Sequence, residues 1–306
     1  MGGVFAGYAT IASLIALGVL LAHLRVIDAA GQRTLSTLAF YVASPALLVT
    51  VLEDSDLGAL FSGALVATTG AVLLTGLAYV ALAALRRRPL GATVVGALCA
   101  AYVNAGNLGL PIAAYVLGDP ALVAPTLLLQ LLVLQPLALT LLDVDRSETR
   151  LSVRRILARP VTNPITVGSA LGLGFALTGQ QLPAAVHDPL ALVGGMAVPS
   201  MLLAYGISLR LGPLPGRGVP PVELAGVVGL KLVLQPVLAY VLGRYALDLS
   251  SAELLAVTVL AALPTAQNVF VIASRYEREP ILARDAIFVS TLLSVPAVVL
   301  ITALVA

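Results

Sequence analysis

The amino-acid sequence predicts an all-α membrane protein of ten transmembrane helices, and three observations carry this prediction. Hydrophobic residues make up 59% of the 306-residue chain, charged residues only 10%, and the mean hydropathy is +1.03. A soluble domain has about 25% charged residues, so a soluble chain of this composition would expose too much apolar surface to water. The apolar residues also fall into ten long runs, and the basic residues alternate between the connections. We therefore expect most of the apolar surface to face lipid.

Each apolar run is close to the roughly 20 residues that a helix needs to cross the hydrocarbon core of a bilayer. No basic residue precedes the first run, as a cleaved signal peptide would require, so we interpret this run as a retained first span. The predicted spans are residues 4–24, 34–52, 60–85, 91–117, 121–142, 161–178, 188–209, 221–243, 252–274 and 284–305.

Basic residues gather on one side of the predicted membrane topology. The odd-numbered connections between spans hold 15 of the 17 lysines and arginines, whereas the even-numbered connections hold only Arg244. Cytoplasmic connections of membrane proteins carry the excess of positive charge. We therefore expect a multi-pass protein of the cell membrane whose odd connections are cytoplasmic and whose two termini are both extracytoplasmic.

The sequence argues against several other classes of protein. Its 17 basic and 15 acidic residues are nearly balanced, so no basic footprint for nucleic acid is visible. The one cysteine, Cys99, lies inside an apolar run, which excludes an internal disulfide and suggests no thiolate metal site. The sequence contains no Ser-His-Asp group, metal-ligand cluster or phosphate-binding loop. We expect neither an enzyme nor a cofactor.

The ten predicted spans divide into two sets of five around a central polar segment. We divide the chain into a first five-helix repeat at residues 1–142, a cytoplasmic linker at 143–160 and a second repeat at 161–306. Because each repeat has an odd number of spans, two repeats of one fold would be inverted in the membrane. Pro111 of the fourth span and Pro264 of the ninth support this relation, because inverted-repeat transporters interrupt a helix in each half.

Polar and helix-breaking residues crowd the middle of two predicted spans. The fourth span contains Asn104, Gly106, Asn107, Gly109 and Pro111, and the ninth contains Pro264, Thr265, Gln267 and Asn268. Amides are costly in hydrocarbon, glycine weakens a helix, and proline removes a backbone donor. We therefore expect interruptions near Asn107–Pro111 and Pro264–Gln267, where unwound backbone lines a cavity inside the protein. The alternative is a pair of kinked helices whose amides bond across the bundle.

Two such interruptions favour an anion site. Helix N-termini at the breaks present free backbone N–H groups, and neutral amides donate hydrogen bonds to a carboxylate. We expect Asn104, Asn107, Gln267, Asn268 and Lys231 to contact the substrate. Lys231 lies near the middle of the eighth span, where no Asp or Glu lies comparably deep. The alternative for this residue is a lysine that snorkels to the membrane surface.

Four further polar residues are secondary candidates for the site. Gln235 follows Lys231 by four residues, so the two share a helical face. Gln130 is better explained as a residue that hydrogen-bonds between helices. For Ser44 and Tyr205, lining a site and packing in the bundle are equal alternatives.

Two segments of the chain resemble the signature segments of the auxin efflux carrier family. NAGNLGLPI at 104–112 and ALPTAQNVFVIASRY at 262–276 carry the resemblance, and KLVLQP at 231–236 is similar to a lesser landmark. The similarity extends span by span over the whole chain. It implies a fold like that of sodium/proton antiporters, in which the fourth and ninth helices are broken and cross. The matching positions are Asn104, Asn107, Pro111, Pro264, Gln267 and Asn268.

The resemblance also implies how such a protein works. Spans 1, 2, 6 and 7 would form a scaffold, often dimeric, and spans 3–5 and 8–10 a transport domain that moves by elevator-type alternating access. Family members carry carboxylates, such as auxin in plants and malate or malonate in bacteria. We therefore expect a carrier of small organic anions that is embedded in membrane lipid, forms a homodimer through its scaffold helices and has no nucleic-acid partner.

The nearest alternative is a sodium- or proton-coupled symporter of the same fold. Proton and sodium sites inside membranes usually contain buried acids, and the sequence predicts none. This argues more strongly against proton coupling than against sodium coupling, because carbonyls and amides also bind sodium. A channel is a weaker alternative, since two broken helices in an inverted repeat favour alternating access.

Overall fold

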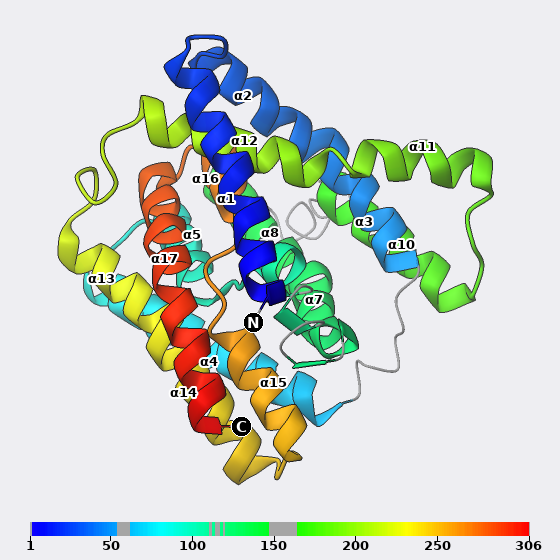
Figure 1. The fold of residues 1–306 in the computed structure, drawn as a ribbon, viewed down its shortest axis with the longest axis vertical. Coiled ribbons are helices and arrows are strands. Elements are labelled where there is room, and N and C mark those ends of the chain that lie inside the picture. The colour runs from blue at the N-terminus through cyan, green and yellow to red at the C-terminus, as the bar shows by residue number, and fades with distance from the viewer. Residues whose placement is uncertain are drawn as a thin grey trace.

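The computed structural model describes residues 2–53, 62–109, 112–113, 117–118, 120–146 and 164–305, with the side chains of a few of these left undescribed. All regular elements in these ranges are helical, which confirms the predicted all-α class (Figure 1). Most of the linker predicted at 143–160 lies outside the described residues.

The first half of the chain contains α1 (Gly2–His23), α2 (Ala29–Leu38), η1 (Ala39–Ala43), α3 (Ser44–Glu53), α4 (Gly63–Leu85), α5 (Leu90–Ala101), η3 (Ala105–Gly109), η5 (Pro120–Val123), α7 (Ala124–Leu129), η6 (Gln130–Leu134) and α8 (Gln135–Asp145). The second half contains α10 (Pro164–Thr178), α11 (Ala184–Gly194), α12 (Ala197–Leu211), α13 (Pro221–Gly229), η8 (Leu230–Leu234), α14 (Gln235–Val241), η9 (Leu242–Ala246), α15 (Ser251–Ala261), α16 (Asn268–Tyr276) and α17 (Pro280–Val305). The label η5 marks a 3-10 turn and the other η labels mark π-helical turns.

Six continuous helices among the described residues are long and apolar enough to cross a membrane. They are Ala29–Glu53, Gly63–Leu85, Pro125–Asp145, Ala184–Leu211, Pro221–Ala246 and Pro280–Val305. Four shorter apolar helices fall in the remaining predicted spans, at Ala12–His23, Leu90–Ala101, Pro164–Thr178 and Ser251–Ala261. Two of these short helices, α5 and α15, belong to the two spans that the sequence predicts to be interrupted.

Three of the long helices contain a π-helical turn that ends two residues before a proline. η1 precedes Pro45, η6 precedes Pro136 and η8 precedes Pro236, each with one residue between. Proline lacks a backbone N–H and its ring crowds the carbonyl of the preceding turn. A wider turn at that point lets the helix continue past the proline, and π-turns of this kind often mark functional sites.

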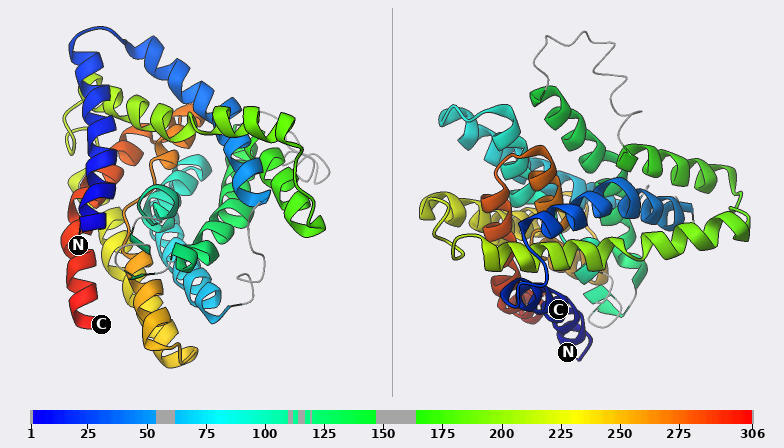
Figure 2. Two further views of the ribbon diagram at one scale, coloured as in Figure 1. Left: turned by 45° about the vertical axis from the view of Figure 1, so that its right-hand side comes forward. Right: turned by 90° about the horizontal axis from the view of Figure 1, so that it is seen from above.

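One group of helices packs around α12 and α3. α1 lies along α12, α2 also contacts α12, and α10 and α11 both pack on α3. The α1–α12 contact is close because two glycines face each other, Gly18 and Gly206. A Cβ atom added to Gly206 would lie 2.1 Å from the carbonyl oxygen of Ile15. In the left view of Figure 2, α1 runs down the left edge of the molecule, and α2, α11 and α12 lie across its upper part.

A second group of helices packs around α5 and α14. α4 contacts α5, α14 and α15, α8 packs on α5, and α17 packs on α13, α15 and α16. Ion pairs join its loops: Arg88, which follows α4, pairs with Glu223 of α13 and, at 3.4 Å, with Glu279. Arg278 pairs with Asp145 of α8 at 2.7 Å. Contacts and ion pairs thus connect α4, α5, α8 and α13–α17, and the assignment of the third to fifth and eighth to tenth spans to one domain stays a prediction.

The structure buries two acids that the sequence analysis did not predict to be buried, Glu53 at the end of α3 and Asp285 in α17. The tenth helix begins at Pro280 rather than at residue 284, so Arg284 and Asp285 lie in its second turn, 2% and 0% exposed. Arg284 donates to Asp285 Oδ1 over 2.6 Å, and Asp285 Oδ2 accepts the backbone N–H of Gly216. The carboxylate is buried because a neighbouring guanidinium balances its charge.

Candidate functional site

Two interrupted helices meet and pair in the interior of the molecule. α5 ends at Ala101, and the chain runs extended through Tyr102 before it coils again in η3. The Asn104 backbone N–H donates to Pro264 O over 2.8 Å, and the Ala266 N–H donates to Tyr102 O over 3.2 Å. Val103 and Thr265 thereby form an antiparallel β-bridge. The two interrupted segments therefore meet at this bridge, and we call this meeting point the crossing.

The positions of the two breaks differ in how well the sequence predicted them. The second lies between Ala261 and Asn268, which includes the predicted Pro264–Gln267, so this prediction is confirmed. The first begins at Tyr102, several residues before the predicted Asn107–Pro111. The backbone of Asn107 lies in η3, its side chain is not described, and Pro111 lies outside the described residues.

The two glycines of the fourth span lie after the break, where they allow close packing. Gly106 and Gly109 both belong to η3. Gly106 lines the cavity described below. A Cβ atom on Gly109 would lie 2.8 Å from a methyl group of Val123 in η5.

Side chains from neighbouring helices satisfy the unwound backbone. The Thr265 hydroxyl donates to Cys99 O over 2.6 Å, and the Thr265 backbone N–H donates to Ser290 Oγ over 3.1 Å. Gln130 donates through Nε2 to Val103 O over 2.9 Å. Buried backbone groups without a partner are costly, so these bonds stabilise the crossing and hold it in one geometry.

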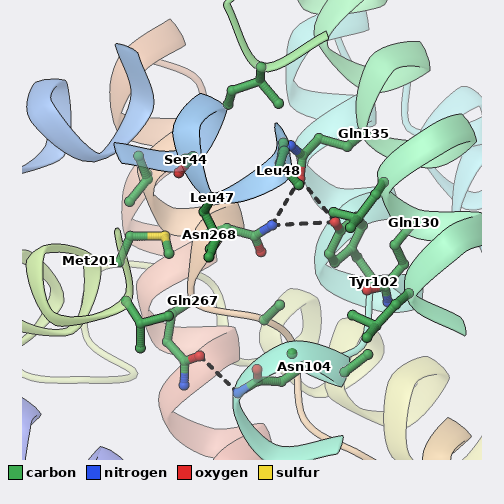
Figure 3. A pocket seen from close by; sticks show the side chains of 18 of the residues that line it. Ser44, Leu47, Leu48, Tyr102, Asn104, Gln130, Gln135, Met201, Gln267 and Asn268 are labelled. Carbon is green, nitrogen blue, oxygen red and sulfur yellow. Dashed lines mark hydrogen bonds between the residues drawn. The ribbon is translucent and has the colours of Figure 1, made fainter. Parts of the chain in front are cut away.

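A cavity of about 310 Å³ opens beside the crossing (Figure 3). Its walls come from η1 and α3, the crossing, α7 and η6, α12 and α16. The polar lining residues are Ser44, Tyr102, Asn104, Gln130, Gln135, Gln267 and Asn268. The apolar part of the lining includes Phe40, Leu48, Val198, Met201 and Ile272.

Two hydrogen-bonded groups hold the polar side chains of the cavity (Figure 3). Asn268 Nδ2 donates to the Tyr102 hydroxyl over 3.3 Å and to Gln135 Oε1 over 3.1 Å. The Tyr102 hydroxyl also donates to Gln135 Oε1 over 3.0 Å. Asn104 Nδ2 donates to Gln267 Oε1 over 2.8 Å, which ties one broken segment to the other.

The cavity offers neutral donors and one positive helix end to a ligand. Its described lining contains amides and hydroxyls but no Asp, Glu, Lys, Arg or His. Ala266, Gln267 and Asn268, at the N-terminus of α16, all line it. A helix N-terminus carries partial positive charge and attracts anions. Among the described residues, no group of three His, Cys, Asp or Glu is placed to hold a metal ion.

Lys231 lies at the crossing but does not line the cavity. It is 0% exposed, and its Nζ donates to Gln235 Oε1 over 2.7 Å and to Ala261 O over 2.8 Å. Gln235 Nε2 in turn donates to Ala101 O over 3.0 Å. The pair therefore binds the last carbonyls of the two helices that precede the breaks, α5 and α15.

The remaining predicted residues divide between the cavity and the packing around it. Asn104, Gln267, Asn268, Ser44 and Gln130 come together at the cavity. Tyr205 lies outside it: its hydroxyl donates to Arg284 O over 2.9 Å and its ring contacts Phe270. Tyr205 thus links α12 to α17 and α16.

The sequence analysis missed Tyr102, because a tyrosine next to the amide motif is not distinguished from the other apolar residues of the span. A short repeat in the sequence could have identified the glutamine that Tyr102 binds. The motif LVLQP occurs at 132–136 and again at 232–236. In both copies the glutamine follows a π-helical turn and reaches the crossing, Gln135 at the cavity and Gln235 at the carbonyl end of α5.

Comparisons with known proteins agree over nearly the whole chain. A sequence model of the family described as "Membrane transport protein" matches residues 4–302. A protein of Rhizobium meliloti (strain 1021) named "Putative malonate transporter" is 29% identical over 303 residues, covering 93% of this chain and 90% of its own length. A protein of Methanothermobacter thermautotrophicus (strain Delta H) named "Uncharacterized transporter" is 31% identical over 291 residues, covering 92% of this chain and 91% of its own.

Proposed function

We propose that this chain, which belongs to the membrane transport protein family, is a carrier of small carboxylate anions. The family membership confirms the resemblance to auxin efflux carriers that the sequence suggested. It makes the chain a multi-pass membrane transporter and not an enzyme. The substrate class and the mechanism are the proposal.

The amide-lined cavity beside the crossing carries this proposal. Its volume of about 310 Å³ suits a small ligand, because pockets for drug-sized molecules run from about 300 to 1,000 Å³. Asn104 and Asn268 bring amide donors to it, and the N-terminus of α16 adds partial positive charge. Asn268 Oδ1 has no hydrogen-bond partner in the described structure, so this amide can turn and accept or donate to a ligand.

The ionisation state of the substrate follows from the same lining. Neutral hydrogen-bond donors and one helix N-terminus together suit a ligand with one negative charge. A second negative charge would lose its hydration shell in a site that has no cationic side chain to replace it. A monocarboxylate fits this condition directly. A dicarboxylate such as malonate fits it as the singly charged anion, with one carboxyl protonated. The name of the Rhizobium meliloti relative makes malonate the first compound to test.

The packing supports an elevator mechanism with two inverted five-helix repeats. Under this proposal α1, α2, α3, α10, α11 and α12 form the scaffold, and the helices packed around α5 and α14 form the transport domain. Both groups line the cavity: Phe40, Leu48 and Met201 come from the scaffold, and Asn104 and Asn268 from the transport domain. A substrate held between the groups is exposed to either side as one slides past the other. We further propose that scaffold helices form a homodimer and that both termini are extracytoplasmic.

The same geometry favours carboxylate transport without an obligatory sodium ion. Carbonyl oxygens of broken helices coordinate sodium in some transporters. Here those of Ala101, Val103, Pro264 and Ala261 already accept hydrogen bonds from protein donors. A sodium ion would have only the second lone pair of each of these carbonyls, beside a donor that already occupies the first.

A thermal-shift screen of the purified protein tests the proposal. Malonate, malate and indole-3-acetate are compared with malonamide, which has the size of malonate but no charge. A ligand that prefers the folded protein stabilises it by about 2.7 kcal/mol at a hundred times its Kd. We expect at least one acid to raise the Tm and malonamide to leave it unchanged. Equal Tm values for all compounds would refute an anion site.

A further inference from the structure

Among the residues that the structure describes, Lys231 is the one charged group at the crossing, and its position there is not explained by contact with the cavity. It is fully buried, it is absent from the cavity lining, and both atoms it binds are uncharged oxygens. A buried charged lysine without an acidic partner is costly, so a protonated Lys231 requires a compensating interaction.

The carbonyl ends of two helices supply that interaction. Ala261 is the last residue of α15 and accepts directly from Lys231; Ala101 is the last residue of α5 and accepts from Gln235, which itself binds Lys231. Each helix C-terminus carries roughly half a negative elementary charge, so the two ends together carry about one. One protonated lysine balances them. The positive N-terminus of α16 is then left to attract a ligand in the cavity.

We propose that protonated Lys231 is a fixed counter-charge of the moving helix group, so that this group crosses the membrane field as a neutral unit when it holds a monoanion and as a cation when it is empty. This inference rests on the proposed function, because it requires a carrier whose transport domain moves. Lys231 lies in η8, between α13 and α14, within the group proposed to move. It is thus a positioning residue for the crossing and a charge carrier, without touching the substrate.

The consequence is a voltage dependence that differs between two modes of transport. Exchange of substrate for substrate uses only the loaded crossing, whereas net transport also needs the empty domain to return. A neutral loaded domain makes exchange insensitive to membrane potential. Without the lysine charge, the loaded domain would carry the negative charge of the substrate and exchange would respond to voltage. With a full elementary charge and a barrier halfway across the field, 100 mV would change the rate about sevenfold.

The test uses full-length protein in proteoliposomes whose potential is set to 0 or −100 mV by a potassium gradient and valinomycin. Radiolabelled malonate is the probe, at a pH between its two ionisation steps and at equal concentration on both sides. For the wild type we expect the exchange rate to change less than about 1.5-fold. As a check on the applied potential, the final accumulation ratio of the transported monoanion should shift by up to about fiftyfold.

Two variants separate the charge of Lys231 from its packing. Lys231→Gln removes the charge and should make exchange voltage-dependent, while Lys231→Arg keeps the charge and should leave exchange insensitive to voltage, whatever its rate. Voltage-dependent exchange in the wild type would overturn the inference, even if Lys231→Gln fails to fold. Exchange that stays insensitive to voltage in Lys231→Gln would also overturn it. If the wild type exchanges no malonate at all, the proposed function has failed for this substrate, and the inference falls with it.

Discussion

Asn268 gives the sharpest perturbation of the candidate site, because two substitutions there predict different losses of affinity. Asn268→Ala removes the amide that donates to Tyr102 and Gln135, but these two residues keep their own bond of 3.0 Å. A lost donor to a charged ligand costs about 1.5–3 kcal/mol. We therefore expect carboxylate binding to weaken roughly tenfold to a hundredfold.

Asn268→Asp keeps the shape of the side chain and adds a negative charge to a lining that has none among its described residues. If the new carboxylate lies roughly 5 Å from that of the substrate, an effective dielectric constant of about 20 gives a repulsion of about 3 kcal/mol. The lost donor adds to this. Binding should then be weaker than in Asn268→Ala by a further factor of ten or more.

Isothermal titration with the monocarboxylate indole-3-acetate at neutral pH, where the ligand is singly charged and an introduced aspartate is ordinarily ionised, measures both variants. Gln180→Ala, an exposed amide in the loop before α11, is the matched control and should bind as the wild type does. The order of affinity should be wild type, then Asn268→Ala, then Asn268→Asp. If Asn268→Asp binds indole-3-acetate as tightly as Asn268→Ala, with unchanged thermal stability, the carboxylate does not lie beside Asn268.

Three further outcomes are expected. Gly206→Ala should lower the free energy of unfolding by about 1–3 kcal/mol, because the new methyl group meets the Ile15 carbonyl. The control is Gly226→Ala on α13, which has open space around it and should not destabilise the protein. Denaturant titration measures both variants. Asn104→Ala and Gln267→Ala should be non-additive in a double-mutant cycle, with a coupling of about 0.5–3 kcal/mol that vanishes if their hydrogen bond is absent. The affinity for malonate should fall as its second carboxyl ionises with rising pH, whereas the affinity for a monocarboxylate should stay constant. If both affinities change with pH in the same way, the site does not select a singly charged anion.

The sequence predicted the helical class, the approximate span positions and the second helix break, because these depend on local composition. Proline at 264 leaves α15 without a donor for its next turn, and the chain unwinds where expected. The first break was misplaced because it depends on a partner. Tyr102 and Val103 are extended through pairing with Pro264–Ala266, which lies some 160 positions away along the chain.

The orientation of polar side chains was harder to predict than their depth. The sequence placed Lys231 and Gln235 on one helical face, and the structure joins them by a hydrogen bond. Which way that face points depends on the packing of η8 against α5, α4 and α17, and this turns Lys231 to helix ends rather than to the cavity. The burial of Asp285 is likewise a tertiary effect, since it depends on Arg284 and on the Gly216 turn.

Uptake of radiolabelled malonate into proteoliposomes preloaded with unlabelled malonate tests the central claim most directly. The account predicts rapid accumulation of label with the wild type, inhibition by other small carboxylates but not by malonamide, and strong loss of uptake in Asn268→Asp at unchanged protein stability. Uptake of label no faster than in protein-free liposomes, for malonate and for the monocarboxylates alike, would contradict the assignment of this chain as a carboxylate carrier.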